Sequence, residues 1–174
     1  MTDGYLLDTN VISVLANSRH PQHAEFQRKA RDLRHVWLPV VAIAEIEFGM
    51  AKSTTIDELQ RQALHRFFER FPQALPFGSN TVEPYSLLRA QLWQNCATAL
   101  KRGHKEKLPE DLFDRVSGKQ LGIDERDLLI ASIAAEHRLI LITRDQNAAM
   151  RAIDRAGKDL RAKGAPIDLQ ITYW

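Results

Sequence analysis

The run Leu139-Ile140-Leu141-Ile142 constrains the fold of this 174-residue chain more than any other segment does. Four large apolar residues in succession leave no polar side for water, so the run predicts a strand that is buried on both faces. Such a strand belongs to a parallel sheet, because parallel sheets are covered by helices on both sides. The fold must therefore supply a layer of helices for each face of the sheet.

Helical patterns and other short apolar runs alternate along the rest of the chain, as this kind of sheet requires. Further strands are expected at 5–7 and 36–38, and Ile167, Leu169 and Ile171 alternate with polar residues in a last, half-exposed strand. This alternation indicates an α/β fold. Helices are predicted at 11–16, 23–33, 40–51, 82–102 and 124–137. A further helix is expected after a cap at Thr54 or Thr55. The last helix is expected to begin at Asp145 or Asn147 and to end near Gly157 or Gly164.

Composition limits the class of protein. Hydrophobic residues make up 44% and charged residues 26% of the chain, which indicates a globular, soluble protein of one domain, residues 1–174. The single cysteine excludes an internal disulfide and favours a reducing, cytoplasmic location. Residues 1–4 lack the features of a signal peptide, and no run is long enough to span a membrane. The net charge of +2 permits a nucleic-acid partner without indicating one.

The charged stretch at 104–122 interrupts the alternation of strands and helices. We interpret it as a surface excursion rather than a domain boundary, with a short helix at about 111–116. Cys96, in the helix before it, is expected to be a core residue.

Asp8 follows the first strand directly, in Tyr5-Leu6-Leu7-Asp8-Thr9-Asn10. Parallel α/β sheets bind ligands beyond the carboxyl ends of their strands, where Asp8 is expected to lie. Alternatively, Asp8, Thr9 or Asn10 only caps the helix that follows.

Glu45 lies within the apolar helix at 40–51, between Val41 and Gly49 at one turn's distance. A carboxylate in such surroundings is costly unless a charged group meets it, which suggests a functional role. The alternative is an amphipathic helix with Glu45 on its wet side and Glu47 on another face.

Two further acids occupy positions comparable to that of Asp8. Asp145 follows the buried strand through Thr143-Arg144, and Asp127 lies in the first turn of the helix before that strand. Both could merely stabilise the amino end of a helix. However, Asp127 shares a helix face with Ala131 and Ala134, which would allow the close approach of a ligand or another helix.

Asp8, Asp127 and Asp145 are all expected at one edge of a parallel sheet. Carboxylates this close repel each other and raise their own pKa values unless a cation intervenes. Clusters of oxygen ligands suit Mg²⁺ or Mn²⁺, and a metal there can bind phosphate oxygens and activate water for in-line attack. The scattered histidines form no zinc pattern, and the sequence has no glycine-rich phosphate loop. A phosphatase with an aspartyl nucleophile is disfavoured because Asn10 stands where a second acid is expected.

Three blocks of the sequence together resemble a PIN domain, and in particular the VapC-like ribonuclease toxins of bacterial toxin–antitoxin pairs. They are Leu-Leu-Asp-Thr-Asn-Val-Ile-Ser around Asp8, Ala-Glu-Ile-Glu-Phe-Gly around Glu45, and the segment from Asp127 through Leu-Leu-Ile-Ala-Ser to Thr-Arg-Asp145. The resemblance implies a three-layer α/β/α sandwich with a central, mainly parallel sheet.

The resemblance also implies roles for residues. Asp8, Glu45 and Asp127 would be catalytic acids, with Asp145 as a fourth, and a Mg²⁺ or Mn²⁺ ion would be held by Asp8, Asp127 and Asp145. Thr143 would support the site, with Thr9, Asn10 and Ser13 as weaker candidates. The implied activity is cleavage of single-stranded RNA by an endoribonuclease that forms a homodimer or a larger assembly and is neutralised by a cognate antitoxin.

The chain departs from the family pattern in three places. An Asp-Phe pair often follows the position of Asp145, and here it is absent, which leaves the fourth acid open. The excursion at 104–122 is longer than usual, and the C-terminal segment at about 157–174 is extended.

The sequence says less about binding partners than about the candidate active site. RNA contacts are conceivable at Arg28, Arg31, Lys101, Arg102 and Lys105, although each side chain could equally belong to a solvated helix face. The stripe Ile56, Leu59, Ala63, Phe67 and Phe71 could receive an antitoxin segment, or it could be ordinary core or dimer surface. A PIN-like module that binds RNA or protein without cleaving is the alternative to an enzyme.

Overall fold

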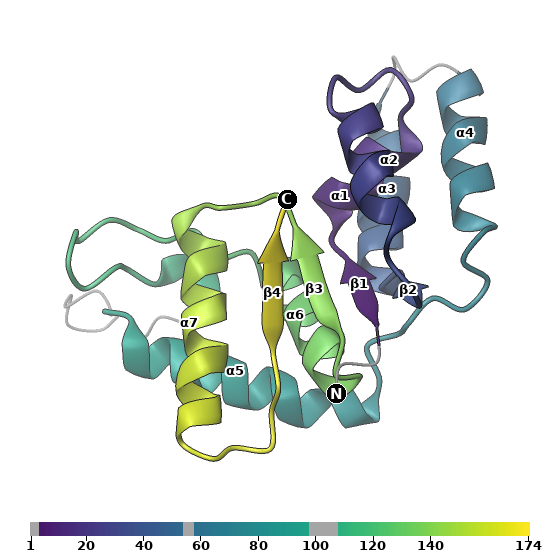
Figure 1. Ribbon diagram of the computed structural model, residues 1–174. Helices are drawn as coiled ribbons and strands as arrows, with labels where there is room; N and C mark the ends of the chain where they lie inside the picture. Colours follow the sequence, from purple (N-terminus) through teal and green to yellow (C-terminus); the bar gives the residue numbers. More distant parts are fainter. Residues whose placement is uncertain (1–3, 54–57, 98–107) are drawn as a thin grey trace.

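The computed structural model describes residues 4–53, 58–97 and 108–174 (Figure 1). Seven α-helices and two short 3₁₀-helices accompany four strands in the described part of the chain. In order, these are β1 (Tyr5–Leu7), α1 (Thr9–Ala16), α2 (His23–Arg31), β2 (Val36–Trp37), α3 (Val40–Lys52), α4 (Glu58–Phe68), η1 (Ser79–Thr81), α5 (Val82–Asn95), η2 (Pro109–Asp111), α6 (Glu125–Glu136), β3 (Ile140–Thr143), α7 (Ala148–Ala162) and β4 (Gln170–Tyr173).

The four strands form one parallel sheet in the order β2-β1-β3-β4. Leu6 pairs with Leu141 and Leu7 with Ile142, and all four side chains are at most 1% exposed. The two central strands are therefore buried on both faces, as the apolar run at 139–142 predicted.

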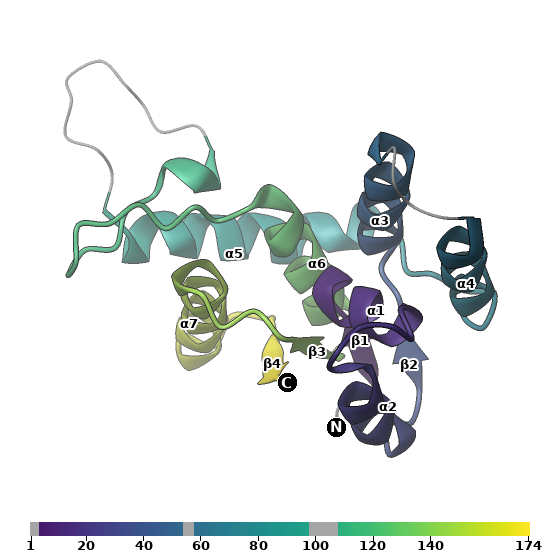
Figure 2. The ribbon, with the colours of Figure 1, turned by 90° about the horizontal axis from the view of Figure 1, so that it is seen from above.

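Helices cover both faces of the sheet, which confirms the predicted three-layer α/β/α architecture. Figure 2 looks down on the carboxyl ends of the strands and shows α2 on one side and α6 on the other. On the second side, α5 packs across both α6 and α7. The small buried residues Ala131, Ala134 and Ala135 allow α6 to approach its neighbours closely. No helix of the described residues is long and apolar enough to cross a membrane.

Most of the predicted elements are confirmed, with shifted ends. α2, α3 and α6 agree with their predicted ranges to within two residues, whereas the last strand begins only at Gln170. Asn147, rather than Asp145, caps α7 by accepting a hydrogen bond from the Met150 amide at 2.8 Å. The predicted cap at Thr54 or Thr55 lies outside the described residues.

Two predictions about the middle of the chain are wrong. The long helix ends at Asn95, because the backbone of Ala97 pairs with that of Phe113 through hydrogen bonds of 2.8 and 3.0 Å. Phe113 also bridges to Gln120, and residues 112–116 form no helix. The 3₁₀-helix η2 ends at Asp111, where the predicted helix was to begin. Leu112 and Ile123 are fully buried, which anchors this part of the excursion to the core. Cys96 is buried as expected, although it ends the helix.

Two glycines within helices differ in the space around them, so their replacement by alanine compares helix propensity with packing. Nothing lies within 4 Å of a Cβ added at Gly49 in α3, whereas a Cβ at Gly157 in α7 would lie 3.0 Å from the Leu169 side chain. We expect Gly49→Ala to raise the free energy of unfolding by about 0.5–1 kcal/mol. Gly157→Ala should give no such gain, because Leu169 would have to move. Urea unfolding of both variants measures the difference, and an equal gain in both would contradict this packing.

Candidate active site

Asp8 is a buried carboxylate at the carboxyl end of β1, with 3% of its surface exposed. One oxygen accepts a hydrogen bond from the Thr9 amide at 2.7 Å, so Asp8 itself caps α1. The other oxygen accepts hydrogen bonds from the Thr143 hydroxyl at 2.6 Å and the Asn10 amide at 2.8 Å. The Asp8 side chain therefore caps α1 and also lies at the carboxyl edge of the sheet, so both interpretations of this residue hold.

Thr143 and Asn10 join the ends of β1 and β3. The Thr143 hydroxyl is fully buried and also accepts a hydrogen bond from the Asp145 amide at 3.0 Å. The Asn10 side-chain oxygen accepts a hydrogen bond from the Arg144 amide at 3.1 Å. Two adjacent strand ends are thus fixed to each other by side chains around Asp8.

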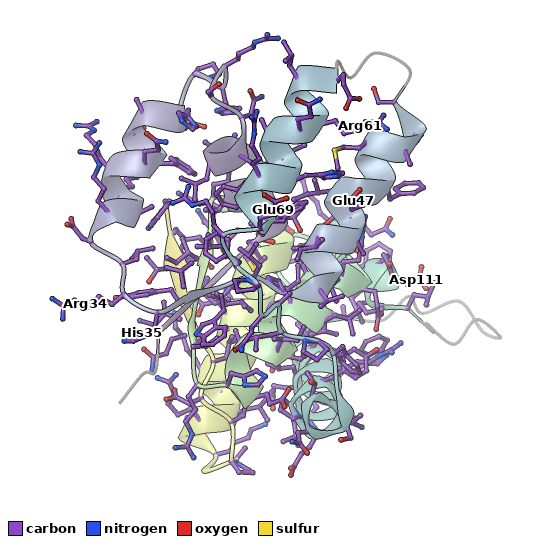
Figure 3. All side chains as sticks on the ribbon, turned by 90° about the vertical axis from the view of Figure 1, so that its right-hand side faces the viewer. Arg34, His35, Glu47, Arg61, Glu69 and Asp111 are labelled. Carbon is purple, nitrogen blue, oxygen red and sulfur yellow. The ribbon has the colours of Figure 1, made fainter. Side chains whose placement is uncertain are left out.

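Glu45 approaches this edge from α3. One of its oxygens accepts a hydrogen bond from the Thr9 hydroxyl at 2.8 Å, and the other lies 2.7 Å from the Arg126 guanidinium. The Glu45 side chain is 28% exposed, so it is neither a buried charge nor part of an open wet face. Glu47, the competing acid, lies on another part of α3 (Figure 3). It pairs with His65 at 3.1 Å.

Asp127 lies in the first turn of α6 and faces the other acids. Burial, followed by the charges of Asp8, Asp124, Asp145 and Glu45, raises its pKa from 3.8 to about 7. Within the described part of the chain, no hydrogen-bond donor satisfies the Asp127 side chain. Asp127 is therefore the acid of this group whose charge the protein compensates least.

Asp145 completes the group from the loop between β3 and α7. Its two oxygens accept hydrogen bonds from the backbone and side-chain amides of Asn147, at 2.9 and 2.8 Å. Its charge helps to raise the pKa of Asp8 as well as that of Asp127, although burial is the larger cause for both. The structure therefore brings together all four acids selected from the sequence.

Sequence reasoning missed Arg126. Its guanidinium is paired with Asp124 as well as with Glu45, and the hydrogen bond from Arg126 is the main cause of a lowered pKa at Asp124. The available signal was its position directly before Asp127, which places a cation beside the acids.

Other candidates lie farther from the acids or outside the described residues. Ser13 is exposed, and its hydroxyl donates to the Thr9 backbone carbonyl at 2.8 Å rather than to any of the four carboxylates. Arg28 and Arg31 lie in the last turn of α2. Lys101, Arg102 and Lys105 belong to the part of the chain that is not described.

Comparison with known proteins identifies the family. A model of the PIN domain matches residues 5–156, so the chain belongs to the PIN domain family. PIN domains are typically nucleases and usually depend on a metal ion. A search of curated proteins found no significant match.

Several solved structures have the same fold, among them a member of a family of toxin–antitoxin systems. A chain of VapBC2 from Rickettsia felis, bound to a DNA fragment from its promoter, matches with a TM-score of 0.59 at 20% identity over 98% of both chains. FitAcB from Neisseria gonorrhoeae matches with a TM-score of 0.54 at 23% identity, over 86% of this chain and 93% of that one. VapBC-5 from Mycobacterium tuberculosis, a member of the VapBC family of toxin–antitoxin systems, gives 0.53 at 18% over 98% of both chains. At these identities the likeness establishes a shared fold.

The donor set fits a hard divalent cation. Every candidate ligand is a carboxylate oxygen, and Asp8 and Asp127 both have raised pKa values that a positive charge would relieve. Among the residues that the structure describes, no three acidic, histidine or cysteine side chains already surround a single point. Mg²⁺ requires no such cage, because it commonly binds through one or two carboxylates and keeps several waters.

The raised pKa of Asp127 makes stability depend on pH. Since the folded protein binds this proton more tightly than the unfolded chain, the contribution of Asp127 to stability is fully present below about pH 4 and is lost as the pH rises through about 7. We expect Asp127→Asn to be more stable than the wild type at about pH 8 in EDTA. The gain is at most about 4 kcal/mol, and solvent screening of the half-buried carboxyl reduces it.

Urea unfolding at several pH values measures this effect, with Glu47→Gln as the control that keeps the wild-type pH dependence. A pH dependence in Asp127→Asn equal to that of the wild type would contradict the assigned repulsion.

Proposed function

We propose that this PIN domain is an endoribonuclease that uses Mg²⁺ or Mn²⁺ to hydrolyse phosphodiester bonds in single-stranded RNA. The observation that carries the proposal is the convergence of four carboxylates, with Asp127 left unpaired by the described residues, on the carboxyl edge of the sheet. A binding module has no need to maintain such repulsion, because the uncompensated acids lower its stability.

Asp8 and Asp127 would hold the metal, with Asp145 as a further ligand directly or through water. The metal would polarise a phosphate oxygen and lower the pKa of a nucleophilic water. Thr143 and Asn10 hold Asp8 in one orientation through hydrogen bonds that favour its charged form. Glu45, fixed by Thr9 and Arg126, would orient the water that attacks the phosphorus.

Loss of either central acid should abolish cleavage while the fold remains. We expect Asp8→Asn and Asp127→Asn to lower kcat/KM for a mixed-sequence single-stranded RNA by at least about 100-fold, because the metal site would lose a ligand. EDTA should abolish wild-type cleavage, and Mg²⁺ or Mn²⁺ should restore it.

Glu47→Gln is the matched control, because it removes an acid from α3 outside the cluster. Full activity of Asp127→Asn, or RNA binding by the wild type without metal-dependent cleavage, would refute the nuclease and favour a binding module.

We further propose that the chain is the toxin of a toxin–antitoxin pair, in keeping with its structural likeness to VapBC complexes. A cavity of about 570 Å³ between α1, α2 and α4 offers a surface for the antitoxin. Leu15, Phe67 and Phe71 give it an apolar lining, and Arg31 and Arg70 lie at its rim. It would therefore accept an apolar segment that carries acidic residues.

This surface modifies the stripe predicted along α4. Phe67 and Phe71 line the cavity, whereas Leu59 is 64% exposed beside a different hollow, and Ile56 lies outside the described residues. The predicted stripe is therefore not one continuous surface, because Leu59 and the pair Phe67 and Phe71 line different hollows.

Charge reversal at the rim tests the antitoxin surface. We expect Arg31→Glu/Arg70→Glu to weaken binding to the protein encoded immediately upstream by at least about tenfold, because opposite charges would be replaced by like charges. Co-purification followed by calorimetric titration measures the effect. Arg34→Glu/Arg138→Glu is the control, and an equal loss in both pairs would argue against this cavity.

A further inference from the structure

A second pocket, of about 220 Å³, is lined by residues outside the acid cluster. Residues from the carboxyl end of α5, from 114–121 and from the first turns of α7 line it. The helices α5 and α7 can be followed in Figure 1. Ala148, the first residue of α7, is part of its wall, and the preceding Asn147 is hydrogen-bonded to Asp145. One wall of the pocket therefore begins three residues after Asp145 in the chain.

Three arginines line this pocket from two elements. Arg151 and Arg155 lie one turn apart on α7, about 6 Å along the helix axis, and Arg115 lies opposite them. Like charges at this helical spacing destabilise a helix, so the arrangement costs stability in the free protein. A bound anion would remove that cost.

The arginines of α7 are compensated only in part: the charge of Arg155 helps to lower the pKa of Asp114, although hydrogen bonds from Ser117 are the larger cause. Neither Arg151 nor Arg155 forms a side-chain hydrogen bond or an ion pair anywhere in the described part of the chain. Arg115 donates a hydrogen bond to the Gln94 carbonyl at 2.7 Å. Asp114 is the one acid of the lining, and it accepts hydrogen bonds from the backbone amides of its own turn, the Val116 amide at 3.1 Å among them. Three guanidinium groups thus share the pocket with one carboxylate, whose Oδ1 accepts the hydrogen bonds from the Val116 and Ser117 amides.

We propose that this arginine pocket, formed by Arg115, Arg151 and Arg155, binds backbone phosphates of the RNA strand on one side of the cleaved bond. The inference rests on the proposed nuclease function, which brings a polyanion to the neighbouring acids. Guanidinium groups match phosphate oxygens bidentately, and two arginines one turn apart can follow successive contacts along a strand. The pocket holds the strand through its backbone, so it contributes affinity without reading sequence.

The test is a pair of double variants with the same change in charge. Arg151→Gln/Arg155→Gln removes the two unpaired arginines from the pocket. Arg34→Gln/Arg138→Gln removes two exposed arginines that precede β2 and β3, at the opposite edge of the sheet. Figure 3 shows Arg34 extending away from the molecule. All four positions are exposed, and thermal unfolding followed by circular dichroism verifies that each variant folds.

Binding is measured by fluorescence anisotropy with a short, labelled single-stranded RNA of random sequence, in EDTA over a series of KCl concentrations. We expect Arg151→Gln/Arg155→Gln to bind about tenfold more weakly at low salt. The slope of log K against log salt should fall by about 1.4, because each lost phosphate contact contributes about 0.7. The Arg34→Gln/Arg138→Gln control should differ from the wild type by less than about twofold.

If Arg151→Gln/Arg155→Gln binds RNA with wild-type affinity, or if both double variants lose affinity equally, the arginine pocket is not an RNA-binding site. Tighter binding of double-stranded DNA than of RNA, dependent on the same two arginines, would overturn the assignment to RNA. Cleavage in Mg²⁺ is measured separately. A wild type that cleaves RNA while the pocket variant binds normally refutes the pocket alone. Arginine-dependent binding by a wild type that never cleaves refutes the proposed function and supports the pocket.

Discussion

The hydrogen bond from Thr143 to Asp8 is the contact on which the candidate site depends. A buried carboxylate at a strand end is unfavourable without donors, and here the hydroxyl of the neighbouring strand, the Asn10 side chain and the Thr9 amide supply them. The same bonds fix the ends of β1 and β3 relative to each other. Asp8 caps α1, and α7 begins soon after Thr143. The contact between Asp8 and Thr143 therefore also positions the amino ends of these two helices relative to the site.

The negative charges of the four acids near the Thr143–Asp8 hydrogen bond are balanced to different degrees. Asp8 and Asp145 are hydrogen-bonded, and Glu45 is held by Thr9 and Arg126. The raised pKa of Asp127 indicates that burial and the repulsion of the other acids outweigh the attraction of Arg126. Packing of the apolar sheet and helices stabilises the fold strongly enough to tolerate this repulsion. A divalent cation would neutralise the acids at the sheet edge, and a phosphate chain would neutralise the arginine pocket formed by Arg115, Arg151 and Arg155.

The sheet and the places of Asp8 and Asp145 were predictable from sequence because each depends on local order along the chain, whereas Glu45 joined the group only through the family resemblance. The apolar run before Thr143 specifies a buried strand, and a residue that follows such a strand must lie at the carboxyl edge. Arg126 was not predictable in this way, since its pairing with Glu45 depends on how α3 and α6 approach each other. The end of α5 was missed for a similar reason, because the distant residue Phe113 pairs with Ala97. Long-range backbone pairing overrode a continuous helical pattern.

Anomalous diffraction from crystals soaked in Mn²⁺ tests the central claim most directly, because it locates the ion without relying on activity. The account predicts a peak bonded to the carboxylates of Asp8 and Asp127 in the wild type, and no peak there in Asp127→Asn. A wild-type peak elsewhere, or none at this edge of the sheet under saturating Mn²⁺, would contradict a metal site built by these acids.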